Sequence, residues 1–412
     1  CMNSAEVLAR QVMHRIDELS AISETPGILT RRYLTAEHRR ANELVGHWMS
    51  GAGMDTWQDA AGNIIGRYDS AQGNAPALII GSHLDTVVNA GKFDGMLGVL
   101  CGVACVQALF QTGRRLTYPI EVIGFADEEG VRFGTTYLGS RAVTGQLDPS
   151  LFEQTDAAGI SFRQALIDFG LEADQIGQAA RHADDVLAFL ELHIEQGPVL
   201  EALGRPAGAV TAINGQTRLS VTITGEAGHA GTVPMGLRRD ALAVAAEGVL
   251  AVERECDGND DVVGTVGILR VTPGAINVIP GEANFTVDIR AKDDVDRRIV
   301  VAEVSRAVQE AAEQRNCFAQ ISVLHEAVSA PCAERMIKII ERAIATVGFE
   351  PCRMPSGAGH DAAAMAELCN VGMIFLRSER GISHNPAERT SEEDVTAGIN
   401  IMMKVLDEME GY

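Results

Sequence analysis

The chain is organised around Gly81-Ser82-His83-Leu84-Asp85-Thr86 and the nearby Phe93-Asp94-Gly95. The apolar run 77–80 comes just before the first stretch and predicts a buried strand. Ligands of open α/β sheets are commonly held at the carboxyl ends of strands. We therefore expect His83 and Asp94 to meet on one divalent metal ion, with Asp85 accepting the other ring N–H of His83. The alternative for this stretch alone is a polar surface loop.

Length and charge limit the class of protein. The chain has 412 residues, which favours two domains. Its formal net charge of −22 disfavours nucleic acid and anionic membranes as partners. The eight cysteines are scattered without a C-x-x-C pair, which fits a reducing compartment. We find no signal peptide and no apolar run long enough to span a membrane, so we expect a cytoplasmic protein.

Alternating strand and helix patterns predict an α/β domain with a mostly parallel central sheet. Its first part carries helices at 5–20, 36–50, 95–111 and 161–170, and strands at 63–68, 77–80, 120–125 and 188–192. Near residue 212 the pattern changes to strands that alternate apolar and polar residues.

The segment 212–327 has the order β-α-β-β-α-β, which is a ferredoxin-like pattern. The predicted elements are strands at 218–224, 262–271, 283–290 and 318–324, and helices at 237–255 and 294–314. The α/β character then returns with a helix at 333–347, a strand at 371–376 and a helix at 392–409. We therefore expect a catalytic domain made of 1–211 and 328–412, with 212–327 inserted as a small separate domain.

Three more polar stretches follow predicted strands. Asp127-Glu128-Glu129-Gly130 offers paired carboxylates, which suit a metal ligand beside a general base if the chain turns there. His193 and His384 each end or follow another strand. Taken singly, a solvated acidic turn explains the carboxylates equally well, and a structural role is the more common one for each histidine. Taken together, five N/O ligands suit Zn²⁺, Mn²⁺, Co²⁺ or Ni²⁺, and they are His83, Asp94, Glu129, His193 and His384.

Asp94 is the carboxylate expected to bridge two ions about 3.5–4 Å apart. In the inserted domain, His229 is flanked by small residues and Arg290 ends a strand, where it can grip a carboxylate with two hydrogen bonds. The alternatives are a loop histidine without a role and a surface ion pair. The backbone of 356–361 can present N–H groups to an anion.

These motifs, in this order, resemble the M20-type metallo-amidohydrolases. Within them the chain is similar to allantoate amidohydrolases, N-carbamoyl-L-amino acid hydrolases and β-ureidopropionases. The resemblance spans nearly the whole chain and rests on these stretches: Ser82–Thr86, Asp94-Gly95, Asp127–Gly130, Glu191–Gly197, Gly228–Gly231, Ser356–Asp361 and His384–Glu388.

The resemblance implies a di-metal α/β domain with an inserted lid domain that forms a homodimer. It implies that His83, Asp94 and His193 bind one divalent ion, and that Asp94, Glu129 and His384 bind the other. Glu128 would be the general base, and His229 with Asn277 would stabilise the oxyanion. Arg290 would take the substrate carboxylate. The implied substrate-contacting positions are Gln196, Gln216, His229, Asn277, Arg290, Gly357 and Ala358.

The resulting hypothesis is a hydrolase that cleaves the ureido (N-carbamoyl) amide of a small carboxylate and releases ammonia and carbon dioxide. The first alternative keeps the fold and makes the protein an M20 dipeptidase or aminoacylase. The second is a non-catalytic solute-binding or scaffold protein, against which the five metal-type ligands and the spare Glu128 weigh.

Overall fold

The computed structural model describes residues 4–73, 75–259 and 261–412, and these form two compact units. The first unit comprises the chain up to Thr211 together with Pro331–Met354 and Ala358–Tyr412. The second comprises Ala212–Ala330 and Pro355–Gly357. Among the described residues, no helix has the length and apolar character needed to cross a membrane.

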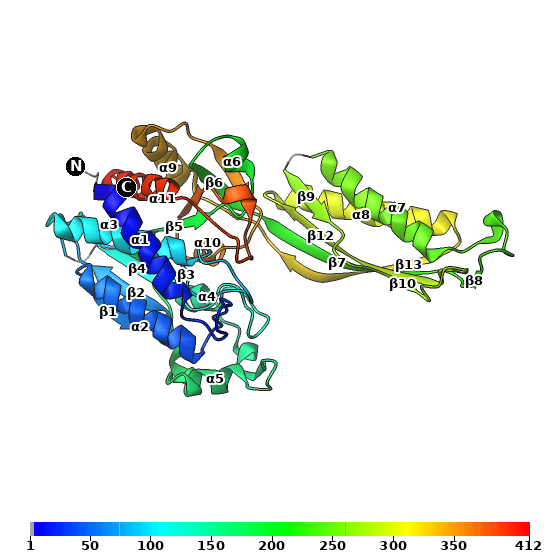
Figure 1. Cartoon of the computed structure of the whole chain (residues 1–412), viewed down its shortest axis with the longest axis horizontal. Coiled ribbons are helices and arrows are strands. Elements are labelled where there is room, and N and C mark those ends of the chain that lie inside the picture. The colour runs from blue at the N-terminus through cyan, green and yellow to red at the C-terminus, as the bar shows by residue number, and fades with distance from the viewer. Residues whose placement is uncertain (1–3, 74, 260) are drawn as a thin grey trace. The chain divides into compact units, whose positions relative to one another are not determined.

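A nine-stranded mixed sheet forms the centre of the first unit, in the order β1-β2-β4-β3-β5-β16-β6-β14, with β15 beside β6. Figure 1 labels the strands β1 to β6 of this sheet. Its four middle strands, β4, β3, β5 and β16, are parallel to one another. The predicted mostly parallel central sheet is therefore confirmed. The strands are β1 (Asp55–Gln58), β2 (Ile64–Tyr68), β3 (Ala77–His83), β4 (Ile120–Phe125), β5 (Val186–Ile194), β6 (Ala207–Ile213), β14 (Ala330–Pro331), β15 (Arg353–Ser356) and β16 (Val371–Leu376).

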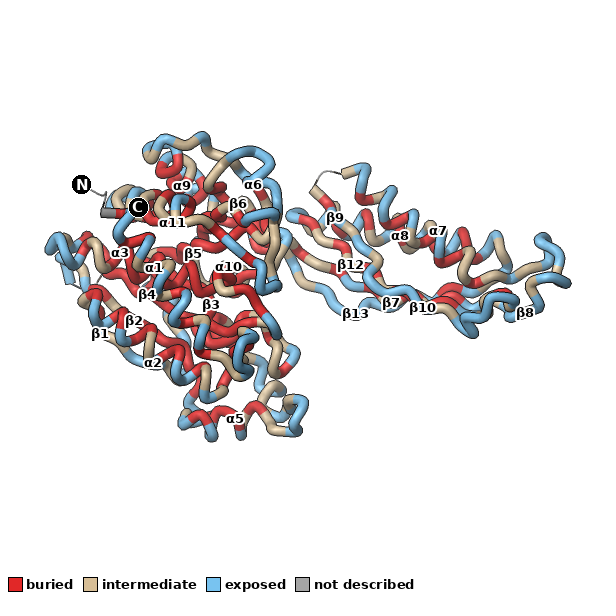
Figure 2. The backbone as a smooth tube through the Cα atoms, viewed as in Figure 1, coloured by how far each residue is buried: buried red, intermediate tan, exposed pale blue. Residues whose placement is uncertain are grey.

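Helices cover this sheet, and helix α3 (Met96–Gln111) packs along its middle strands β3, β4 and β5. A Cβ at Gly98 would lie 2.1 Å from the carbonyl oxygen of Leu192, so only glycine permits so close an approach. Burial is accordingly concentrated in α3 and the middle strands (Figure 2). The other helices are α1 (Ser4–Ser20), α2 (Ala36–Gly51), α4 (Leu138–Thr144), α5 (Phe162–Asp168), α6 (Val199–Ala202), α9 (Glu334–Val347), α10 (Asp361–Met365) and α11 (Glu392–Met409).

The second unit is a five-stranded antiparallel sheet with two helices packed on one face. The strand order is β10-β12-β7-β13, and β9 also pairs with β12. In β7, buried residues alternate with more exposed ones, as the sequence predicts for a half-buried strand. The elements are β7 (Gly215–Thr224), α7 (Ala241–Asp257), β9 (Val262–Thr265), β10 (Leu269–Thr272), β12 (Glu282–Ala291), α8 (Asp294–Gln314) and β13 (Phe318–Ala327), with the short β8 (Gly228–His229) and β11 (Val278–Ile279) paired together.

Two predicted elements of this unit differ from the structure. The single strand predicted at 262–271 is wrong, because β9 and β10 are separate strands that pair with different parts of β12. The helix predicted from 237 begins at Ala241, since the Asp240 carboxylate accepts the N–H groups of Leu242 and Ala243 and so caps the helix.

Candidate active site

The polar side chains singled out in the first unit follow the carboxyl ends of its parallel strands. His83 ends β3 and His193 lies near the end of β5. Glu129 comes after β4, and His384 comes after β16. Because β4, β3, β5 and β16 are neighbours in the sheet, their carboxyl ends meet at one edge. Asp94 reaches the same place from the loop that leads into α3.

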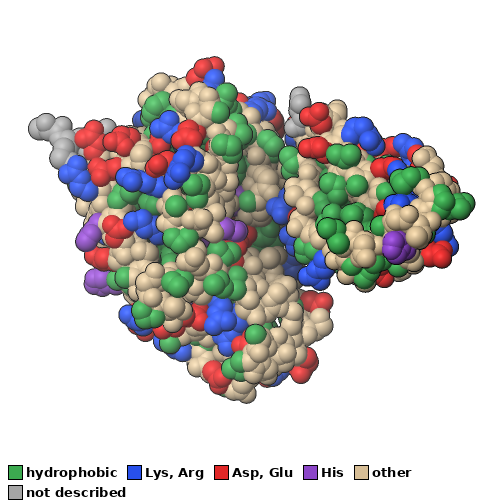
Figure 3. Space-filling model, turned by 45° about the vertical axis from the view of Figure 1, so that its right-hand side comes forward, with side chains coloured by type: hydrophobic (Ala, Val, Ile, Leu, Met, Phe, Trp, Pro, Cys, Tyr) green, Lys and Arg blue, Asp and Glu red, His purple; other side chains and the backbone are tan. Residues whose placement is uncertain are grey.

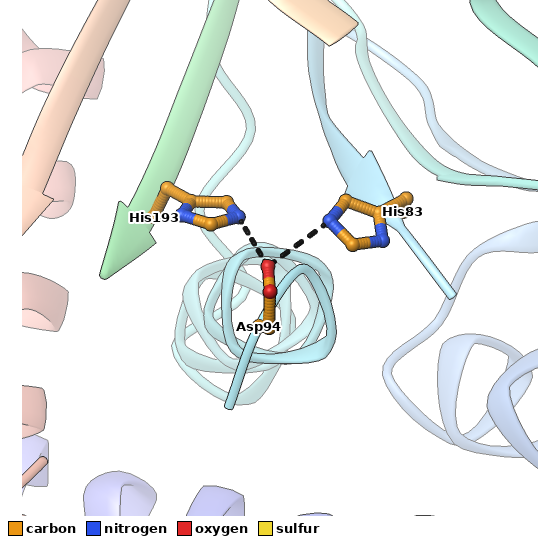
Figure 4. Close-up of side chains that lie close together, drawn as sticks. All are labelled: His83, Asp94 and His193. Atoms are coloured by element: carbon orange, nitrogen blue, oxygen red, sulfur yellow. Dashed lines mark ion pairs between the residues drawn. The ribbon is translucent and has the colours of Figure 1, made fainter. Parts of the chain in front are cut away.

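The first cluster joins His83, Asp94 and His193, which point toward one another in Figure 4. The Nε2 atoms of His83 and His193 lie 3.3 and 3.1 Å from Oδ1 of Asp94. All three side chains are buried, and their ligand atoms lie within 4.8 Å of one another. Two nitrogens and one oxygen therefore face a common point.

The second cluster uses the other oxygen of the same carboxylate. His384 Nε2 lies 3.1 Å from Oδ2 of Asp94 and 3.4 Å from Oε1 of Glu129. Asp94 thus belongs to both clusters, with Oδ1 toward the two buried histidines and Oδ2 toward His384. A carboxylate turned in this way suits a bridge between two ions.

The histidine tautomers fit metal binding at Nε2. His193 Nδ1 lies 2.8 Å from its neighbour's carbonyl oxygen, and its Nε2 receives the N–H of Gly95 at 3.2 Å. His83 Nδ1 lies 3.0 Å from the backbone oxygen of Asp85. A proton on Nδ1 of each ring satisfies these carbonyl oxygens, so Nε2, which hydrogen-bonds to Asp94 when no ion is bound, is the ring atom that can bind one.

Asp85 has a different main contact from the one expected. His83 Nδ1 lies 3.0 Å from the backbone carbonyl oxygen of Asp85 and 3.5 Å from its carboxylate oxygen, so the carbonyl is the closer acceptor. The Asp85 carboxylate instead accepts the backbone N–H groups of Glu128 and Glu129 at 2.9 and 3.1 Å. Asp85 therefore ties the end of β3 to the turn that carries both glutamates.

Electrostatics at this edge favour a cation. Burial raises the pKa of Glu128 well above its usual range, and burial likewise raises the pKa of Asp127 and Asp361. For Asp94 burial acts in the same direction, but hydrogen bonds from the three histidines outweigh it and hold the pKa well below its usual range. One buried oxygen of Asp127 and one of Asp361 have no hydrogen-bond partner among the described residues. Buried carboxylates in this number are costly unless positive charge compensates them, so the residues fit divalent metal ions.

Comparison with known proteins agrees with this geometry. The sequence pattern of peptidase family M20/M25/M40 matches residues 79–408. The chain belongs to this family. It is 44% identical to an N-carbamoyl-L-amino acid amidohydrolase of Geobacillus stearothermophilus, over 96% of this chain and 97% of that protein. It is 42% identical to a probable allantoate deiminase of Oryza sativa subsp. japonica, over 98% and 89% of the two chains.

A solved structure supports the same placement within the M20 family. The crystal structure of a hydantoinase/carbamoylase family amidase from Burkholderia multivorans superposes with a TM-score of 0.93 at 30% identity, over 98% of both chains. The predicted family is thus confirmed, and so is the prediction of a hydrolase that acts on carbon–nitrogen bonds other than peptide bonds. The relatives do not support the dipeptidase or aminoacylase alternative.

The remaining candidate residues of this M20 chain lie in the second unit, except Gln196 and Ala358. Gln216 on β7 and Arg290 on β12 are cross-strand partners, and both bind the Asp288 carboxylate, at 2.8 and 3.1 Å. Arg290 also donates to the carbonyl oxygen of Gly357 at 2.8 Å. With apolar residues of β9 and β13, Arg290, Asp288 and Gly357 line a cavity of about 680 Å³.

His229 and Asn277 lie at another part of the second unit. His229 belongs to β8, which pairs with β11, and Ala230 N donates to the carbonyl oxygen of Asn277 at 3.0 Å. The two residues therefore share one short hairpin-like ribbon, and the His229 side chain is exposed.

Sequence reasoning missed several buried polar residues of the M20 site. His360 forms a third possible ligand cluster with Glu191 and His193. Glu191 is two residues from His193 on β5, so the strand period already places both on one face of the sheet. At His360 the sequence predicts only a backbone loop that can bind an anion. Glu388 contacts the Asp94 loop across 294 residues of sequence, a pairing that no local pattern reveals.

Gly95 gives a first prediction, because its backbone carries Asp94 into place. Its φ is +71°, and a Cβ there would lie 2.5 Å from the His83 ring. We expect Gly95→Ala to lower the free energy of unfolding by about 1–3 kcal/mol and to weaken metal binding by displacing His83. Thermal unfolding and metal titration test this. Gly177→Ala is the matched control, since a Cβ at Gly177 meets nothing within 4 Å. Equal behaviour of the two variants would contradict the assignment.

Proposed function

We propose that this chain hydrolyses the ureido (N-carbamoyl) C–N bond of a small carboxylate, releasing ammonia and carbon dioxide. Candidate substrates are an N-carbamoyl-L-amino acid and allantoate, in keeping with the names of the relatives. The observation that carries the proposal is the Asp94 carboxylate, whose two oxygens face separate ligand clusters close to a buried Glu128. Few structural roles call for so many buried acids and histidines in one place.

The proposal assigns two divalent ions to each subunit. His83, Asp94 and His193 would hold one ion, and Asp94, Glu129 and His384 the other. Ligands of nitrogen and oxygen suit Zn²⁺, Mn²⁺, Co²⁺ or Ni²⁺. When bound, such ions polarise a substrate carbonyl and lower the pKa of water.

Glu128 has the position and the environment of a general base. The turn after β4 directs it toward the clusters, and it shares a cluster with His83 and Glu129. Only 7% of Glu128 is exposed, and its raised pKa means that it holds a proton more readily than a surface glutamate. It therefore takes a proton from the attacking water and returns it to the leaving amine.

The second unit supplies the proposed substrate contacts. Arg290 would grip the substrate carboxylate, with Gln216 and the Gly357-Ala358 backbone close by in sequence or in space. His229 and Asn277 would donate to the oxyanion. Gln196, in the first unit, would contact the substrate beside Asp94, to which it already donates a hydrogen bond.

A homodimer formed through the second unit is part of the proposal. Large apolar side chains are exposed there, and hydrophobic groups are visible on its surface in Figure 3. They include Met235, Leu237, Leu250, Phe318, Val323 and Leu324. Apolar area of this kind is typical of a surface that another subunit covers. A sedimentation measurement that gives only monomers would remove this part of the proposal.

The direct test is an ammonia-release assay. Chelator-treated protein is reloaded with Mn²⁺, Co²⁺, Ni²⁺ or Zn²⁺ and offered allantoate, N-carbamoyl-L-amino acids and ureidopropionate, with N-acetyl amino acids as controls. We expect turnover of at least one ureido substrate and none of the N-acetyl compounds. Hydrolysis of N-acetyl amino acids alone, or retention of ligand without any bound metal, would overturn the proposal.

Arg290 gives a second prediction. Replacing it by lysine keeps the charge but removes the planar fork that matches a carboxylate. We expect Arg290→Lys to lower kcat/KM for an N-carbamoyl-L-amino acid by about tenfold or more, mainly through KM. Arg239→Lys is the matched control, because Arg239 lies in the same unit and pairs with Glu226, outside the residues that line the cavity. Equal losses in both variants would show that the effect does not come from the substrate carboxylate.

A further inference from the structure

Glu388 is a buried carboxylate to which neither the family match nor the proposed mechanism gives a role. Only 3% of it is exposed. Its Oε1 accepts the backbone N–H groups of Phe93 and Asp94 at 2.8 and 3.0 Å. Its Oε2 accepts the hydroxyl of Ser383 at 2.7 Å, and Ser383 immediately precedes His384. One carboxylate therefore links the two loops that carry Asp94 and His384.

Gln196 closes these contacts into a ring. Its side-chain Nε2 donates to Oδ2 of Asp94 and to Oγ of Ser383, both at 3.0 Å. The ring then runs from Asp94 through Glu388, Ser383 and Gln196 back to the Asp94 carboxylate. Every link except that between Gln196 and Ser383 has a carboxylate as the acceptor, and hydrogen bonds to charged groups are the stronger ones.

Backbone geometry shows that the ring is tightly held. Gln196 and His384 are not glycines, yet their φ angles are +59° and +52°. Such conformations persist where the surrounding structure determines them. A Cβ at Gly91 would lie 2.3 Å from the Glu388 side chain, so the Asp94 loop can approach Glu388 only with glycine there.

We propose that Glu388 is a positioning residue for the metal pair, and that it acts by fixing the orientation of Asp94 relative to His384. This inference rests on the proposed function, because it presupposes that Asp94 and His384 bind ions. The Asp94 carboxylate must direct one oxygen to each cluster, and a small rotation would spoil both. Glu388 opposes that rotation by holding the backbone N–H of Asp94, while Gln196 holds Oδ2 of the Asp94 side chain.

The test measures metal affinity, which a purely structural glutamate would leave unchanged. Chelator-treated protein is titrated with Co²⁺ against a chromogenic chelator, and the Co²⁺ absorption spectrum is recorded. We expect Glu388→Ala to weaken binding by about 10–100-fold, the usual cost of losing a partner of a metal ligand, and to alter the spectrum. Glu388→Gln retains an acceptor for both N–H groups, so it should keep most of the affinity.

Glu121→Ala is the matched control. Glu121 is also 3% exposed and bound on both oxygens, but its partners are Arg67 and Arg181 near the start of β4, away from the clusters. We expect this variant to lose stability and keep the metal affinity of the native protein. If Glu388→Ala weakens binding no more than Glu121→Ala does, the inference is overturned.

A variant that does not fold and a native chain that binds no metal are distinct outcomes. If Glu388→Ala does not fold, Ser383→Ala breaks the same ring at a milder site, and unchanged Co²⁺ affinity in that variant would overturn the inference. If the native chain itself binds no metal, the proposed function fails, and this inference fails with it. If the native chain binds Co²⁺ and the variants bind it equally well, only the role of Glu388 is refuted.

Discussion

Glu128→Gln is expected to lower kcat by at least about 100-fold while the variant folds and binds metal as the native protein does. Glutamine occupies nearly the same volume but cannot accept the proton of the attacking water or return it to the leaving amine. The backbone N–H of Glu128 still reaches Asp85, so the turn after β4 should keep its shape. Ammonia release at saturating substrate measures the loss, and metal content is measured on the same sample.

The control for this experiment is Glu121→Gln, which removes a buried negative charge near the start of β4, at the other end of the strand from the Glu128 turn. It should retain turnover, with some loss of thermal stability. Near-normal kcat for Glu128→Gln would show that another group takes the proton. A variant without bound metal would instead show that Glu128 helps to hold the ions, and it would remove Glu128 from the role of a separate base.

The fold could be predicted from sequence where one physical signal dominated. Apolar runs such as 77–80 and 120–125 predict fully buried parallel strands, and both are buried throughout β3 and β4. The strand predicted at 262–271 failed because an apolar run does not show where pairing changes. Partners of both β9 and β10 lie in β12, about twenty residues further along the chain, so the break depends on tertiary pairing.

The candidate site likewise contains residues that the sequence could predict and residues that it could not. His83, Glu129, His193 and His384 could be found because each follows a recognisable strand, and adjacent parallel strands bring such positions together. Glu388 could not, because its only local signal is a glutamate after an Asn-Pro turn. Its partners Phe93 and Asp94 lie 295 and 294 residues away. Long-range hydrogen bonds to backbone N–H groups leave no periodic pattern in a sequence.

Charge explains why an acidic chain can act on an anion. The formal net charge of −22 repels small carboxylates at long range. The bound ions would offset the negative charge of their carboxylate ligands and of the surrounding buried acids. On the second unit Arg218 and Arg290 surround one Asp288, which leaves one positive charge beside the cavity. Local compensation, rather than the net charge, would therefore attract the substrate.

Asp94→Asn is expected to abolish binding at both ion positions, since Asp94 alone belongs to both clusters among the described residues. An amide presents one oxygen and one N–H₂ group, so it cannot coordinate an ion on each side. The proposed reaction would then lose the polarised carbonyl and the activated water, which together supply several kcal/mol, so kcat/KM should fall by roughly 1000-fold or more.

His384→Ala separates this result from a general loss of structure. His384 serves only the second cluster and its side chain is half exposed, so its removal should lower the metal content from two ions to one. Ion binding should also raise the melting temperature of the native protein, because a ligand that binds only the folded chain stabilises it. We expect that rise to be absent in Asp94→Asn and reduced in His384→Ala. If Asp94→Asn still binds two ions, the carboxylate does not bridge them, and the pairing of the two clusters through Asp94 is wrong.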